Sequence, residues 1–133
     1  MLARAQSLRS ERDWSGAARA YRELIRRHPG SDEARSSLVS LAQIELGKLG
    51  RPARALKGFD AYLARAQGGP LMLEALLGRA RALRALGRKG EERAALERFL
   101  ERFPKALQAN DVRERLESLS ASNQSSELDS DKK

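Results

Sequence analysis

The one histidine of the chain, His28, is the side chain best suited to acid–base chemistry, yet it lacks the partners that such chemistry needs. A hydrolase triad would require a serine nucleophile, typically in a Gly-x-Ser-x-Gly turn, and no such turn occurs. A zinc site would require further histidine or cysteine ligands, and the chain has no cysteine. We therefore expect His28, which precedes Pro29, to end a helix, where a partly positive imidazole is favoured.

Two other groupings are also expected to be structural. Gly68-Gly69-Pro70 reads as a turn, because no Gly-x-x-x-x-Gly-Lys-Ser/Thr motif is present to cradle a phosphate. Glu91 and Glu92 are interpreted as an exposed pair at a helix start, where acids stabilise the helix dipole. The sequence thus predicts a protein that is not an enzyme and has no metal site and no cofactor.

The composition favours helices throughout. The chain contains no threonine and only four valines and isoleucines, whereas Ala, Leu, Arg and Glu dominate. Strands prefer β-branched and aromatic residues, and helices prefer the residues found here. No run of about 18 apolar residues occurs, so no membrane span is predicted. We expect an all-α fold.

The formal net charge is +8, and most of it comes from arginine. Such a surface attracts acidic partners, nucleic acid or anionic membranes, although a merely solvated surface has the same composition. Single-strand recognition would need exposed aromatic residues. The aromatic residues fall instead at helical core spacing: Trp14, Tyr21, Phe59, Tyr62, Phe99 and Phe103. Nucleic-acid binding therefore remains the alternative hypothesis.

A repeat is visible in the sequence. Residues 13–29 align with residues 88–104 without a gap, and both segments end in proline. A middle copy runs from Pro52 to Gln67, and a second type of segment, with apolar residues at helical spacing, alternates with these copies. The expected helices cover residues 2–11, 14–28, 32–49, 52–66, 71–86, 89–103 and 106–120.

The last expected helix, 106–120, reads as a cap on the final repeat. Four apolar residues are expected to cover that repeat: Leu107, Val112, Leu116 and Leu119. Four charged residues are expected to stay outside: Arg113, Glu114, Arg115 and Glu117. Residues 121–133 lack apolar periodicity and are predicted to be a disordered polar tail, which leaves residues 1–120 as the domain.

These paired helices resemble tetratricopeptide repeats. The small residue that opens the second helix of a pair corresponds to Ala17 and Ala55, with Glu92 in the third copy. The glycine between the helices corresponds to Gly50 and Gly87, with Arg12 in the first copy. The remaining consensus positions correspond to Tyr21, Phe59 and Leu96 for the aromatic residue, and to Ala5, Gln43 and Ala80 for the small residue of the first helix. The resemblance implies a right-handed superhelix of about three antiparallel helix pairs plus a C-terminal capping helix.

Residues 14–21 and 99–104 are similar to bacterial envelope-associated repeats, as in the periplasmic Tol-Pal coordinator, outer-membrane assembly lipoproteins and the C-terminal domains of some anti-sigma regulators. Two localisations follow as expectations. The N-terminus carries no secretory signal, which predicts a cytoplasmic protein if the chain is complete. The resemblance predicts instead a periplasmic domain of a longer bacterial protein.

The resemblance also implies a function. In this family the first helix of each pair lines a concave groove that holds a partner, which predicts a protein–protein interaction scaffold. The positions that would face the groove are Gln6, Arg9, Ser37, Ser40, Ile44, Lys48, Glu74, Leu77, Arg81 and Arg84. Guanidinium groups bind carboxylates through paired hydrogen bonds, so the expected partner is a protein or peptide with acidic groups. Self-association through the terminal repeats is compatible with this role.

Overall fold

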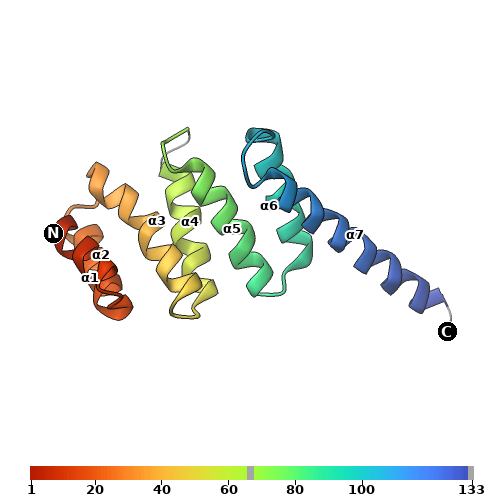
Figure 1. The fold of residues 1–133 in the computed structure, drawn as a ribbon, viewed down its shortest axis with the longest axis horizontal. Helices are drawn as coiled ribbons and strands as arrows, with labels where there is room; N and C mark the ends of the chain where they lie inside the picture. The colour runs from red at the N-terminus through yellow and green to blue at the C-terminus, as the bar shows by residue number, and fades with distance from the viewer. Residues whose placement is uncertain (66–67, 132–133) are drawn as a thin grey trace.

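The computed structural model describes residues 1–65 and 68–131, and within these ranges all regular secondary structure is helical (Figure 1). Seven helices follow one another: α1 (Leu2–Ser10), α2 (Trp14–Arg27), α3 (Asp32–Gly47), α4 (Pro52–Arg65), α5 (Met72–Ala85), α6 (Lys89–Arg102) and α7 (Ala109–Asp131). The predicted all-α fold is confirmed. The first six helices start and end within a few residues of the predicted bounds, while residues 66 and 67 of the middle repeat lie outside the described residues.

The helices form a linear array in which each one packs against the next, and α3 also contacts α5. Figure 1 shows the array extended from α1 and α2 at one end to α7 at the other, so the two termini lie far apart. This is the architecture of a helical repeat superhelix, in which a repeat buries its apolar face only by stacking on its neighbours.

Local sequence signals set the helix ends. The Ser31 hydroxyl accepts a hydrogen bond from the backbone N–H of Ala34 at 3.0 Å and thereby caps α3. Asp13 caps α2 in the same way through Gly16, at 2.9 Å. Gly50 and Gly87 adopt the left-handed backbone conformation that favours glycine after a helix, with φ of 61° and 71°.

The predicted core positions are buried. Ala17 and Ala55 are fully buried where successive helices cross, and Tyr21, Phe59, Tyr62 and Phe99 are buried with them. Trp14 and Phe103 are half-buried at the edge of the core. Gly78 on α5 is required at its position, because a Cβ atom there would lie 2.3 Å from the ring of Phe59.

Glu92 was expected on an exposed helix start, and that expectation is wrong. Its side chain occupies the place of Ala17 and Ala55 in the third pair and is only 1% exposed. Arg115 on α7, which was expected to stay outside, donates two hydrogen bonds to its carboxylate. Because the ion pair satisfies the buried charge, a carboxylate can stand where the other repeats have alanine.

The cap differs from the prediction at its start. Val112 and Leu119 are buried as expected and Leu116 is half-buried, but Leu107 is 94% exposed. The reason is that residues 103–108 form turns and α7 begins only at Ala109, so the helical spacing that would have turned Leu107 inward does not apply.

The last helix extends beyond residue 120 to Asp131 and projects away from the other helices (Figure 1). Residues 132 and 133 of the proposed tail lie outside the described residues. A helix without a packed face gains little from tertiary contacts. The disorder of residues 121–133 in solution accordingly stays a prediction.

Candidate binding groove

A hollow of about 600 Å³ runs across the first helix of each pair, and we call it the groove. Its walls come from α1, α3 and α5, with one side chain of α4 at its floor and the turn before α7 at its end. The residues that line it are Arg9, Gln43, Leu46, Gly47, Phe59, Leu73, Glu74, Leu77, Gly78, Arg81 and Gln108. The floor is therefore apolar and the rim is polar, as in typical ligand sites.

A smaller hollow of about 130 Å³, the end pocket, continues the groove between α5, α6 and α7. The two share Leu77, Arg81 and Gln108. The end pocket adds an apolar floor and several charged residues: Ala80, Arg84, Glu92, Leu96, Asp111, Val112 and Arg115. Together the two hollows extend from α1 to α7.

Half of the predicted groove residues are found there. Arg9, Glu74, Leu77 and Arg81 line the groove, and Arg84 lines the end pocket. Lys48 instead places its ammonium group over the ring of Trp14, 4.9 Å from the ring centroid. The others line neither hollow: Ser37 and Ile44 are buried, Ser40 is half-buried and Gln6 is exposed.

The errors concentrate on α3 because the predicted alignment was one residue out of register there. The buried small residues of the first helices are Ala5, Ala42 and Ala80, whereas Gln43, which was predicted for this position, is exposed. The cause lies in the turn that follows the helix. The backbone N–H of Arg51 bonds to the carbonyl of Glu45, six residues back.

The equivalent hydrogen bonds after α1 and α5 span only five residues, from Asp13 to Leu8 and from Arg88 to Leu83. The turn after α3 therefore contains one extra residue. Gln43 consequently faces the groove where Arg81 does in the next repeat, and Leu46 takes the place of Arg84.

The charges of the groove are mixed. Four arginines and three carboxylates line the two hollows together, so the formal net charge of their lining is +1. Arg9, Arg81 and Arg84 have no hydrogen bond or ion pair with any described residue. These three guanidinium groups are therefore available to a ligand.

Among the other charged residues of the two hollows, Arg115 and Glu92 are paired with each other. The hydrogen bonds of Glu92 raise the pKa of Arg115 and fix its guanidinium against α6. Glu74 on α5 has a buried Oε2 without a hydrogen-bond partner among the described residues. That oxygen would favour a ligand that offers a donor at this point of the groove.

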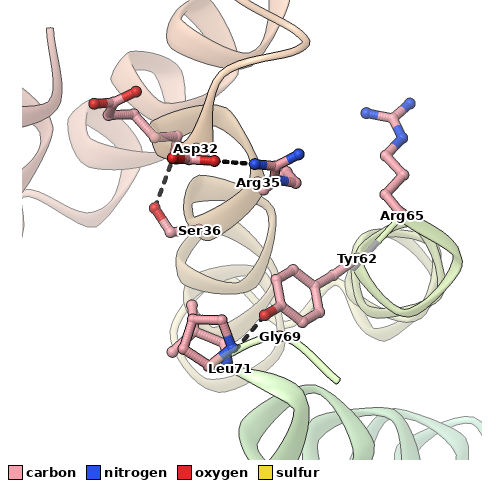
Figure 2. A pocket seen from close by; sticks show the side chains of 9 residues that line it. Asp32, Arg35, Ser36, Tyr62, Arg65, Gly69 and Leu71 are labelled. Carbon is pink, nitrogen blue, oxygen red and sulfur yellow. Dashed lines mark hydrogen bonds and ion pairs between the residues drawn. The ribbon is translucent and has the colours of Figure 1, made fainter. Parts of the chain in front are cut away.

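A separate hollow of about 550 Å³ lies where α3 begins and α4 ends (Figure 2). There the Tyr62 hydroxyl accepts a hydrogen bond from the backbone N–H of Leu71 at 2.9 Å, which ties the α4–α5 connection to α4. Arg35 is paired with Asp32 on the same helix. Figure 2 draws Arg65 on α4, apart from this ion pair and without an interaction to the residues shown. Tyr62, Asp32 and Arg35 thus interact with neighbouring parts of the protein, which gives each of them a structural role.

Residues 1–65 and 68–131 contain no group of three or more side chains placed to hold a metal ion. No described helix combines the length and the apolar character needed to cross a bilayer.

Comparison with known families gives one result. A family model described as tetratricopeptide repeat matches the chain twice, over residues 2–48 and 44–106. The two matches together cover α1 to α6, the three helix pairs whose first members line the groove. No curated protein matches the chain.

Proposed function

Because the chain belongs to the tetratricopeptide repeat family, we propose that it is a scaffold that holds a segment of another protein in the groove. Repeats of this family generally mediate protein–protein interaction, and the family is typically non-enzymatic. The observation that carries the proposal is the groove itself, a hollow of about 600 Å³ with an apolar floor and two unpaired arginines, Arg9 and Arg81, on its rim.

The lining residues indicate the chemistry of the partner. Leu46, Leu73 and Leu77 at the floor suit apolar side chains. The unpaired guanidinium groups of Arg81 and Arg84 suit carboxylates. Because three carboxylates of the protein line the groove and the end pocket, a densely charged polyanion would be partly repelled. We therefore propose a peptide or helix in which acidic and apolar residues alternate.

The alternative function is non-specific binding of nucleic acid or another polyanion by the basic body. Residues 121–133 hold three acids and two lysines, so residues 1–120 carry +9. Such binding weakens steeply with salt, because it depends on the release of counterions. Contacts to an apolar groove floor should weaken much less, and salt dependence therefore separates the two functions.

Peptides selected from a displayed random library on the full chain provide the test. We expect them to bind Arg81→Glu/Arg84→Glu at least about tenfold more weakly than wild type, because both guanidinium contacts are reversed in charge. The matched control is Arg19→Glu/Lys57→Glu, which changes the net charge equally at two exposed positions on α2 and α4. Equal weakening of both variants, or a shift of random duplex DNA at about 150 mM salt, would support the polyanion function instead.

We also propose the envelope-associated type for these repeats, on the strength of residues 14–21 and 99–104. This proposal concerns the compartment and does not affect the groove. Fractionation of cells that carry the natural gene with an epitope tag tests it. Recovery from the periplasm or envelope supports it, and recovery from the cytosol supports the cytoplasmic assignment.

A further inference from the structure

The apolar core is divided between two clusters that meet at α3. The larger cluster contains nineteen buried residues, which come from α3 to α7. The smaller contains five, four of them on α1 and α2 and the fifth, Ile44, on α3. On α2, the partly buried Ile25 is the residue that packs against the larger cluster. The first helical hairpin, α1–α2, thus joins the rest of the protein mainly through one face of α3.

That face of α3 carries polar groups that the protein leaves unpaired. Ser37 is 0% exposed and its hydroxyl has no partner among the described residues. Glu45 is 4% exposed, and its Oε2 also lacks a partner. On the facing helix, Nη2 of Arg22 is buried and likewise unpaired. Three of the four unpaired buried side-chain atoms recorded for the described residues therefore belong to this junction, which we call the seam.

Glu45 shows how unfavourable the seam is. The guanidinium groups of Arg22 on α2, Arg54 on α4 and Arg51 before α4 all favour its charge. Burial outweighs their combined effect and raises the pKa of Glu45 above its usual value. The docked hairpin consequently holds a carboxylate in surroundings that disfavour its charge, whereas undocking would return that carboxylate to water.

We infer that α1–α2 docks on and undocks from α3 as one unit, across the seam, while α3 to α7 remain folded. Sub-global opening of this kind occurs where a unit has little apolar contact with its neighbours. The inference has a consequence for binding, and this part rests on the proposed function. Arg9 is the hairpin's contribution to the groove lining, so undocking removes one wall of the groove and a bound partner favours the docked state.

Native-state hydrogen exchange on the full chain tests this inference. We expect the amides of α1 and α2 to exchange together, and faster than those of α5 and α6. Phe99→Leu, in the larger cluster, should speed exchange in α5 and α6 about fivefold and leave α1 and α2 unchanged, because it destabilises the docked and undocked states alike. A variant that speeds all helices equally would show one cooperative unit and overturn the inference.

Seam variants give the complementary readout. Glu45→Gln removes the disfavoured charge and Ser37→Ala removes the unpaired hydroxyl, so each should slow exchange in α1 and α2 about fivefold. The matched control is Glu74→Gln, whose buried unpaired oxygen lies in the groove and outside the seam. Exchange in α1 and α2 that is unaffected by both seam variants, or slowed as much by Glu74→Gln, would overturn the inference.

A selected acidic peptide separates this inference from the proposed function. At saturation it should protect α1 and α2 further, because it contacts Arg9 in the docked state. Peptide binding without that protection overturns the regulatory part of the inference and leaves the proposed function standing. Separate exchange of the hairpin in a protein that binds no peptide would instead contradict the proposed function.

Discussion

The guanidinium of Arg115 on α7 donates two hydrogen bonds to the carboxylate of Glu92 on α6, at 2.8 and 2.9 Å. The ion pair stands at the helix crossing where Ala17 and Ala55 stand in the preceding repeats. It thereby fixes the last helix at the end pocket, where both residues contribute to the lining.

We expect Arg115→Ala to lower the free energy of unfolding by about 3 kcal/mol, because it leaves the buried carboxylate of Glu92 without a partner. The double variant Glu92→Ala/Arg115→Ala should lose less than the single one, because it restores the alanine of the other repeats and removes the buried charge. Urea denaturation measures both. A double variant as unstable as the sum of the two single variants would show that the pair is not coupled.

Gly78→Ala should destabilise the protein by about 1–3 kcal/mol, because the added methyl group would collide with the buried ring of Phe59. Gly90→Ala is the matched control, since it also adds a methyl group within a helix but meets no atom within 4 Å. It should stabilise by about 0.5–1 kcal/mol through helix propensity. Thermal melting of both variants gives the comparison, and a stable Gly78→Ala protein would contradict the α4–α5 packing described above.

Arg12 holds the left-handed conformation, with φ of 62°, at the place where Gly50 and Gly87 follow the other first helices. Arg12→Gly should therefore stabilise the chain by up to about 1 kcal/mol, because it relieves the steric strain of a Cβ atom in that conformation. The reverse change, Gly87→Ala, should destabilise by a similar amount. Chemical denaturation should show a higher free energy of unfolding than wild type for Arg12→Gly and a lower one for Gly87→Ala.

The sequence predicts the helices well because the composition favours helix throughout and several helix ends carry local signals. Capping residues such as Ser31 and glycines such as Gly50 act within a few residues, so they can be recognised without knowledge of the fold. Half of the residues expected in the groove line neither hollow, mainly because one extra residue in the turn after α3 shifts the register and has no distinctive residue type. The burial of Glu92 depends on Arg115, which lies 23 residues away on another helix, so only the packed structure reveals it.

The raised pKa of Glu45 makes the free energy of unfolding depend on pH. Its pKa is raised above 4.5 in the folded state, so the stability that it contributes is present below that value and is lost as pH rises through its folded pKa. Glu45→Gln is neutral at every pH, so its advantage over wild type should grow between pH 4.5 and pH 7. Urea denaturation at the two pH values measures the difference.

Glu23 provides the control with the opposite sign. The hydrogen bond from Arg26 lowers the pKa of Glu23, so its contribution is lost as pH falls. Any excess in the free energy of unfolding of wild type over Glu23→Gln should therefore shrink towards low pH. The same slope for both variants would contradict the assignment of Glu45 to a buried site.

The most direct measurement of the central claim is the position of a bound peptide. A photo-crosslinking residue at Gln43, which lines the groove, should capture a selected peptide labelled with a fluorophore. The same residue at Ala94, which is exposed on α6 and outside both hollows, should capture none. Capture at Gln43 that an excess of unlabelled peptide abolishes is the result we predict. Equal capture at both positions, or capture at Ala94 alone, would contradict the groove as the binding site.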